Sequence, residues 1–348
     1  MSVYVSKNPI DIREKISQLD KPIGTAGQSI LSANTKKDQQ ELLGVGKRNL
    51  LINSNFQVSQ RGDYTNSTSI TGTEYYLDRW KTVVSGAASF QHNKNIELPN
   101  GEKTNSAKCT VTSSNGYVAI QQWIEDYNII SGKAVTLSFW MRTNIPNMFI
   151  SLYLGSAGQP RFEIQQDSDA TEEWKHYEIT IDVTKVNVTA ARPEFWSQFQ
   201  EPGAFFEVSN VQLEASPVAT PFEHRSYGEE LALCQRYFYT IGGEDVNQFI
   251  GTGQCYSSNQ VNGITVSPPV ELRTKDFTFT VSDILHFKVQ NSTGSGQALA
   301  SITIGTAENS AKIIGLRAVT SGTPLVAGNT TLLYASNTSA RLSFDAEF

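Results

Sequence analysis

Residues 134–142 read Ala-Val-Thr-Leu-Ser-Phe-Trp-Met-Arg, and this stretch decides the predicted fold. Every second residue from Val135 to Met141 is apolar, so these side chains would project from one face of a β-strand. The same alternation recurs in three further stretches, residues 117–125, 148–154 and 176–183. About eight such strands, separated by turn residues, fit between residues 49 and 223. They predict a two-sheet β-sandwich of the jelly-roll type.

The composition of the whole chain agrees with a mainly β protein and narrows its class. Its 348 residues include 25 glycines and only 18% charged residues, a balance that favours short strands joined by turns. The formal net charge of −6 argues against a surface for nucleic acid. No apolar run reaches the ~20 residues of a membrane span, and the first residues contain no signal-peptide core. We therefore expect a soluble protein without membrane insertion or an export signal.

The residue types that usually carry catalysis or hold metals are scattered along the chain. The three cysteines and four histidines lie far apart, and none has a partner at the spacing of a metal site or an activated nucleophile. Neighbouring carboxylates such as Glu125 and Asp126 would point to opposite faces of a strand, so they do not indicate an acid–base pair. The sequence thus predicts no catalytic residue, metal site or cofactor, and we expect a protein that is not an enzyme.

The first 48 residues differ from the rest because they have a helical pattern. Asn8 and Pro9 suit the start of a helix and Pro22 its end. Its apolar face would carry Ile12, Ile16 and Leu19. A second short helix is predicted before Gly44. Isolated helices of about ten residues are only marginally stable, so both helices must pack against another protein surface. We interpret residues 1–48 as a segment that attaches the chain to a larger assembly; packing on its own β domain is the alternative.

A second change of pattern falls at residues 224–243, where a connecting helix is predicted. Ser226 and Glu229 form a capping box, and Leu231, Cys234 and Phe238 have the spacing of one helix face up to Thr240. Strand patterns then return and continue to the end of the chain. Residues 244–348 are therefore predicted to form a smaller C-terminal β domain, for oligomerisation or receptor binding.

Three stretches resemble a known group of proteins: NLLINSNFQVSQRG at 49–62, LDRWK at 77–81, and FFEVSNVQLEASPVATPFEHRSYGEELALCQRYF at 205–238. They are similar to the carbohydrate-binding-module-like jelly roll of tailed-bacteriophage fibres and other virion structural proteins, especially of marine, podovirus-like phages. With the similar N-terminal segment and the closing ARLSFDAEF, the resemblance covers about half of the chain. Within LDRWK, Trp80 is expected to anchor the core.

The resemblance implies a virion structural protein, assembled in the host cytoplasm, whose N-terminal segment attaches to other virion proteins. It implies a homotrimeric tail fibre that binds host-surface glycans. A capsid decoration or head-fibre protein is the alternative, and a depolymerase of host polysaccharide is a third possibility. Structural Ca²⁺ is common in such sandwiches, and Asn53, Asn55 and Glu214 carry suitable oxygens, although no loop has a defined ligand spacing.

Aromatic side chains on the polar faces of the predicted strands suggest where a saccharide could bind. Sugars pack their C–H faces on aromatic rings while polar side chains hydrogen-bond to their hydroxyls. The candidate residues are the rings of Trp140, Trp123, Tyr153, Tyr117 and Phe149, with Gln121 and Arg142 as hydrogen-bonding partners. Because aromatic residues are also frequent in protein interfaces, loops, the N-terminal helices or a neighbouring subunit could instead cover these rings.

Overall fold

The computed structural model describes residues 48–113, 116–146, 148–155, 161–166, 170–198, 200–291, 293–305 and 310–348. For residues 161–166 it describes the backbone alone. Residues 49–348 belong to one unit. The predicted attachment helices, with Ile12, Ile16 and Leu19, lie outside the described residues.

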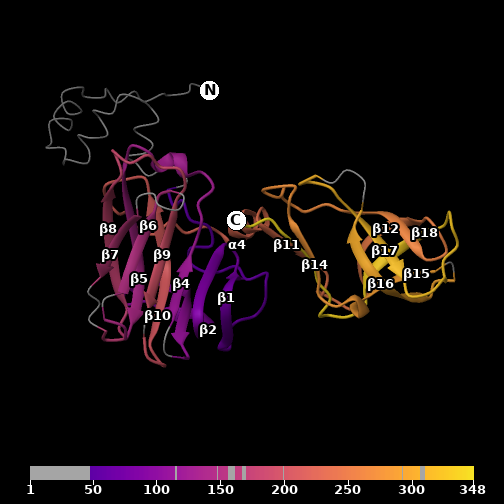
Figure 1. Ribbon diagram of the computed structural model, residues 1–348, viewed down its shortest axis with the longest axis horizontal. Helices are drawn as coiled ribbons and strands as arrows, with labels where there is room; N and C mark the ends of the chain where they lie inside the picture. Colours follow the sequence, from indigo (N-terminus) through magenta and orange to yellow (C-terminus); the bar gives the residue numbers. More distant parts are fainter. Residues whose placement is uncertain are drawn as a thin grey trace, which may run out of the picture. The chain divides into compact units, whose positions relative to one another are not determined.

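Ten antiparallel strands form the larger sheet, and all but β1 lie in the order β7-β6-β9-β4-β2-β3-β10-β5-β8 (Figure 1). The strands are β1 (Thr68–Leu77), β2 (Trp80–Glu97), β3 (Lys103–Val111), β4 (Tyr117–Gln121), β5 (Ala134–Thr143), β6 (Met148–Tyr153), β7 (Arg161–Gln166), β8 (Lys175–Asp182), β9 (Arg192–Gln198) and β10 (Phe205–Glu214). Strand β1 pairs with β2, outside this path. A short 3₁₀ helix, η1 (Tyr127–Ile130), precedes β5.

Strand β2 connects the two halves of this sheet. Its first part, from Lys81 to Ser85, pairs with β4, and its second part, from Ala88 to Glu97, pairs with β3. Gly86 lies between the two parts with φ +105°, a conformation that favours glycine. The sheet is therefore continuous and curled, rather than the two separate sheets that the sequence predicted.

The two halves of the curled sheet enclose one apolar core. The ring of Phe139 on β5 lies 4.8 Å from that of Phe195 on β9, so side chains from both halves meet. The alternate apolar residues predicted to face inward, from Val135 to Met141, are buried. Trp80 is also buried and donates from Nε1 to the Asn53 carbonyl over 2.8 Å, as expected for a core anchor. Each large apolar side chain buried in this way stabilises the fold by about 1.5–3 kcal/mol.

The connecting helix begins where it was predicted and ends earlier. Helix α4 (Tyr227–Gln235) has the capping box formed by Ser226 and Glu229. The predicted continuation to Thr240 is wrong, because Phe238–Ile241 is strand β11, paired with β19 (Leu342–Asp345). No helix in the described part of the chain is both long and apolar enough to cross a membrane.

The C-terminal part contains a closed six-stranded barrel and a three-stranded sheet. The barrel order is β12-β13-β17-β16-β15-β18, and the sheet order is β11-β19-β14 (Figure 1). The remaining elements are β12 (Gln248–Cys255), β13 (Gln260–Val266), β14 (Thr278–Val281), η2 (Ile284–His286), β15 (Phe287–Gln290), β16 (Gly296–Ile304), β17 (Ile314–Thr320) and β18 (Thr330–Ala335). Barrel closure leaves these six strands without free edges.

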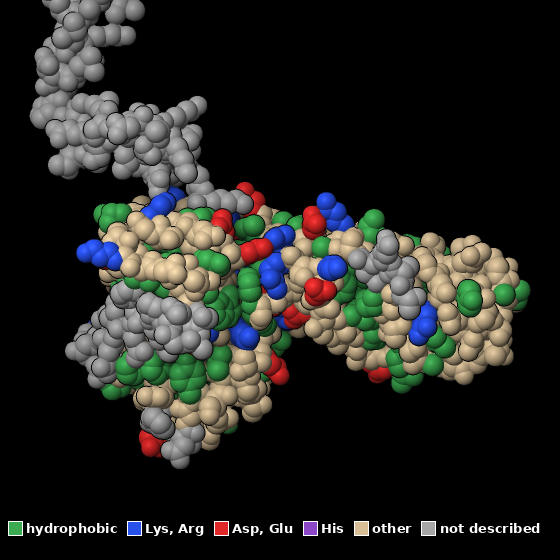
Figure 2. Space-filling model, turned by 45° about the horizontal axis from the view of Figure 1, so that its top comes forward, with side chains coloured by type: hydrophobic (Ala, Val, Ile, Leu, Met, Phe, Trp, Pro, Cys, Tyr) green, Lys and Arg blue, Asp and Glu red, His purple; other side chains and the backbone are tan. Residues whose placement is uncertain are grey.

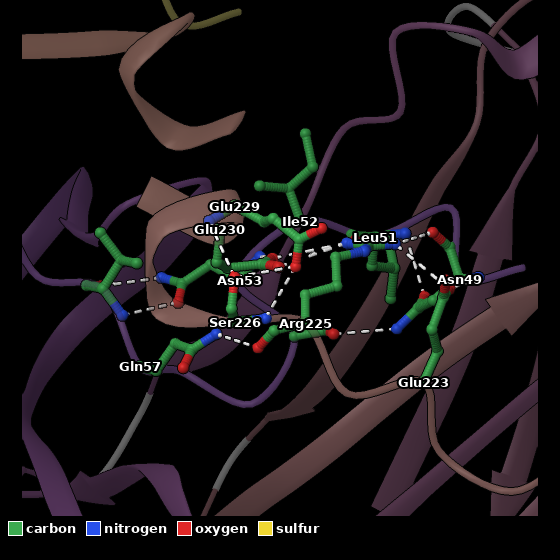
Figure 3. Close-up of polar contacts among 12 residues, drawn as sticks. Asn49, Leu51, Ile52, Asn53, Gln57, Glu223, Arg225, Ser226, Glu229 and Glu230 are labelled. Atoms are coloured by element: carbon green, nitrogen blue, oxygen red, sulfur yellow. Dashed lines mark hydrogen bonds and ion pairs between the residues drawn. The ribbon is translucent and has the colours of Figure 1, made fainter. Parts of the chain in front are cut away.

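The stretches that carried the family resemblance pack against one another. Asn53, at φ +55°, is fully buried and donates from Nδ2 to the carbonyls of Val58 and Asp78 over 2.8 and 2.9 Å. Its backbone N–H donates to Glu230, at the start of α4. Figure 3 shows this polar network joining the residues after Asn49 to those around Arg225. The resembling residues thus build the connection between the sandwich and α4.

The two calcium candidates with described side-chain partners already use their oxygens within the chain. The Asn53 Oδ1 accepts from the Val58 N–H over 2.8 Å. The Glu214 carboxylate accepts from Thr220 Oγ1, Thr220 N and Gln212 Nε2 over 2.6–3.0 Å. The backbone carbonyl of Asn55 accepts from Asn105 over 3.4 Å. Among the described residues, no group of three or more His, Cys, Asp or Glu side chains could hold a metal ion.

Charged side chains are unevenly distributed over the surface. On the face seen in Figure 2, Lys and Arg are interspersed with Asp and Glu near the middle of the view. The end formed by the barrel shows mostly uncharged side chains. On this face, charged side chains of both signs are therefore most frequent near the middle of the view.

Candidate functional site

The structure divides the predicted saccharide-binding residues between two outer faces of the sandwich. Tyr117, Gln121, Trp123, Phe149 and Tyr153 lie outside the core on the half that contains β4, β9 and β6. Trp140 and Arg142 lie on the opposite half, on β5. In both halves the alternate residues point into the shared core, so these candidate side chains project in opposite directions.

The face on β4, β9 and β6, which we call the aromatic face, contains three rows of side chains beside the pair formed by Tyr117 and Gln198. Strand register defines them: Ala119, Trp196 and Phe149 form the first row, and Gln121, Glu194 and Ser151 form the second. Arg192 and Tyr153 form the third row, and Trp123 follows the end of β4 beside them. Rows two residues apart are separated by about 7 Å. A polar row therefore lies between two rows that carry aromatic rings.

The rings of the aromatic face are held by stacking. Phe149 stacks on Trp196 with 4.2 Å between ring centroids and 13° between planes, and Tyr117 lies 5.4 Å from Trp196. Trp123 and Tyr153 meet edge to face at 5.9 Å. Trp196 is mostly buried, whereas Tyr117, Trp123, Phe149 and Tyr153 are half-buried. Four rings thus keep part of their surface available for contact.

Hydrogen bonds fix the polar groups between these rings. Tyr117 donates from its hydroxyl to Glu194 Oε1 over 2.6 Å, and Trp196 Nε1 donates to Ser151 Oγ over 2.8 Å. The Arg192 guanidinium lies 4.7 Å from the Trp123 ring centre and 4.9 Å from that of Tyr153, and it contacts Glu194 at 3.4 Å. Because the Arg192 charge is balanced by Glu194, the aromatic face suits an uncharged polar ligand.

Gln121 is the exception in this arrangement. It is only 4% exposed, and its Oε1 has no hydrogen-bond partner in the part of the chain that the structure describes. A buried acceptor without a partner costs about 1–3 kcal/mol. A ligand hydroxyl donating to this oxygen would remove that cost.

The opposite face, on β5, has a different character. Arg142 donates from Nε to Glu207 Oε2 over 2.7 Å, and the fully buried Glu207 also accepts from Ser106 and Asn93. The Trp140 ring lies 5.2 Å from His176. Arg142 is therefore held in an ion pair, and this face carries two half-buried rings, Trp140 and Trp174, the second with its centre 5.3 Å from the Arg142 guanidinium.

Three residues of the aromatic face were missed in the sequence: Arg192, Glu194 and Trp196. Between residues 192 and 197 they alternate with Pro193, Phe195 and Ser197, so the period of a strand was present. Proline at the second position weakens such a pattern because it cannot donate to a neighbouring strand.

No family model and no curated protein matches the chain. Similar solved structures include the enzymatically active domain of tailspike protein 4 of bacteriophage CBA120, at 15% identity over 48% of this chain, with a TM-score of 0.36. The carbohydrate-binding module TmCBM61, in complex with β-1,4-galactotriose, is 13% identical over 49% of this chain and 100% of its own, with a TM-score of 0.30. A family 11 carbohydrate-binding module from Clostridium thermocellum, in complex with a mixed-linked tetrasaccharide, is 16% identical over 44% of this chain and 98% of its own, with a TM-score of 0.27.

The matched region spans only 21% of the tailspike chain. At these identities and TM-scores the similarity is distant and concerns the β-sandwich fold of about half of this chain.

Proposed function

We propose that this chain binds saccharides through the aromatic face, as a non-enzymatic structural protein of a phage virion. One observation supports the binding site most strongly: a polar row with an unpartnered Gln121 oxygen lies between two rows of half-buried aromatic rings. Rings contact the C–H faces of a sugar, and the polar row accepts or donates hydrogen bonds at its hydroxyls.

Removing one ring of the aromatic face tests the binding site. Trp123→Ala should weaken binding of the full chain to its best-bound bacterial surface oligosaccharide by about tenfold or more, because the loss of one ring contact costs about 1.4 kcal/mol. The oligosaccharide is selected on a glycan array, and the affinity is then measured by calorimetry.

Trp140→Ala is the matched control, because Trp140 is also a half-buried tryptophan but lies on the opposite face. This variant should keep the affinity of the unmodified chain. Loss of binding in Trp140→Ala with full binding in Trp123→Ala would move the site to the β5 face and refute the aromatic face. An unchanged melting temperature and circular dichroism spectrum establish that each variant is folded.

The virion role is supported by the resemblance of residues 49–62, 77–81 and 205–238 to phage fibre proteins. In this proposal the chain is a homotrimeric tail fibre that residues 1–48 attach to the tail, and three weak sites on one trimer raise the affinity for a host surface. Antibodies against the barrel should label the tails of intact particles in electron micrographs. Label on the capsomers would instead identify a decoration protein, and unlabelled particles would contradict any virion role.

A further inference from the structure

A groove of about 540 Å³ lies between the sandwich and the three-stranded sheet β11-β19-β14, and its lining includes no residue of the aromatic face. The sandwich contributes the segment from Ser59 to Asp63, together with Lys94. The three-stranded sheet and its flanks contribute Phe238, Thr240, Thr280, Ser282, Arg341 and Ser343. Most of these side chains carry a hydroxyl or a positive charge.

The hydroxyl wall of this groove follows from strand register. Thr240 on β11 and Thr280 on β14 both pair with Ser343 on β19, so the three hydroxyl side chains form one row across the sheet. Neighbouring residues point the other way: Phe344 stacks with Tyr239 and also contacts the tilted ring of Phe279, within the apolar core of the C-terminal strands. Because successive side chains alternate between faces, the hydroxyl row must face the groove.

One hydroxyl in this row, Thr240 Oγ1, is both buried and without a hydrogen-bond partner among the described residues. A hydroxyl can both donate and accept, so an oxygen of a bound sugar would satisfy it. The wall therefore suits a ligand rich in hydroxyl or carboxylate oxygens.

Positive charge at the groove is only partly balanced. Arg61 is paired with Asp345 at 2.8 Å and with Glu347 at 3.5 Å. Lys94 is exposed and lies 3.7 Å from the exposed Asp63, a weak pair in water. Arg341 donates to the carbonyls of Thr338 and Ala340 and forms no ion pair with any residue that the structure describes. Lys94 and Arg341 are thus available to a negatively charged group.

We propose that this groove is a second binding site, specific for acidic saccharides that carry carboxylates, such as oligomers of uronic acids. The hydroxyl row and Thr240 bind the sugar oxygens, while Lys94 and Arg341 attract the carboxylates. The site differs from the aromatic face both in residues and in charge preference, so it does not depend on the function proposed for that face.

The test compares trigalacturonate with the neutral galactotriose, using calorimetry on the full chain at low salt. Trigalacturonate should bind at least about fivefold more tightly, and the preference should fall as salt screens the charges. Lys94→Gln should weaken trigalacturonate binding about three- to fivefold, whereas Asp63→Asn should strengthen it about twofold by removing a repulsive charge. Thr240→Val, which keeps the side-chain volume, should weaken binding about two- to tenfold.

Two controls separate binding in the groove from general attraction to surface charge and from binding on the aromatic face. Lys312→Gln removes an exposed lysine that does not line the groove and should leave the affinity unchanged. Trp123→Ala should likewise leave trigalacturonate binding intact. In the Trp123→Ala background, equal affinity for both sugars would refute the proposal, and so would a weakening by Lys312→Gln as large as that by Lys94→Gln. Loss of trigalacturonate binding in Trp123→Ala alone would assign the acidic sugar to the aromatic face instead.

Discussion

His92 on β2 is a titratable residue buried inside the sandwich. Neither ring nitrogen hydrogen-bonds to any residue in the described part of the chain. Burial, together with the nearby Lys94 ammonium, lowers the pKa of His92 to about 4, while the backbone of Phe56 and, more weakly, the carboxylate of Asp63 act in the opposite direction. The fold therefore accepts only the neutral imidazole at neutral pH.

This lowered pKa makes the stability of the fold depend on pH. In the unfolded chain His92 binds a proton near pH 6.5, so between pH 6.5 and about 4 the unfolded state holds more protons than the folded state. The free energy of unfolding should therefore fall as the pH drops through this window, by about 2–3 kcal/mol at pH 4.5 relative to pH 7 from this residue. Urea unfolding of the unmodified chain and of His92→Leu at both pH values measures it. Between pH 7 and pH 4.5 the free energy of unfolding of His92→Leu should fall by about 2–3 kcal/mol less than that of the unmodified chain. An equal fall in both proteins would contradict the prediction.

At the residue scale, the alternation of side chains predicted part of the candidate site. It placed Tyr117, Trp123 and Tyr153 outside the apolar core, where the structure has them. It could not show that Trp140 lies on the opposite half of the sandwich. Alternation separates the two faces of one strand, whereas the assignment of strands to halves depends on pairing between residues far apart in the sequence.

At the scale of elements, starts and types were predicted better than ends. Strands predicted at 134–142, 148–154 and 176–183 occur at Ala134–Thr143, Met148–Tyr153 and Lys175–Asp182. The helix starts at its capping box, which is a local signal. Its end is set by a strand that pairs with residues about a hundred positions later, and a local pattern contains no information on that pairing.

Two barrel strands, β12 and β13, were not singled out in the sequence, and glycine explains part of this. Gly253 lies within β12, where glycine normally weakens a strand pattern. A Cβ at this position would lie 2.6 Å from Ile264 Cγ1 and 2.7 Å from Val261 Cγ1 on β13. Glycine is thus required by close packing between neighbouring barrel strands, a demand that appears only once the barrel has formed.

At the scale of the whole unit, the last residues connect the C-terminal strands to the sandwich. The side chain of Glu347 is buried, like that of Arg79. Its carboxylate accepts hydrogen bonds from the Arg79 backbone N–H over 3.2 Å and from the Arg79 guanidinium. Arg273 donates to the carbonyls of Ala346 and Glu347 over 2.7 and 2.9 Å. Arg79 also lies 3.6 Å above the Tyr237 ring and donates to the Trp123 carbonyl. One buried guanidinium therefore holds the sandwich, the residues after α4 and the final segment together.

Replacing Glu347 by glutamine should loosen this connection selectively. The substitution leaves the Arg79 charge buried without its main counter-charge, and removing one partner of a buried ion pair costs about 3–5 kcal/mol. Hydrogen exchange should accelerate at the Arg79 amide, which donates to Glu347, and at the Ala346 amide, which donates to the Tyr237 carbonyl. The amides of β17 inside the barrel should keep their protection. Glu244→Gln, at an exposed glutamate, should change neither set. If Glu347→Gln left the Arg79 and Ala346 amides protected, the sandwich and the barrel would be held together by the other contacts, and Arg61–Asp345 and Arg236–Glu125 would be the next pairs to remove.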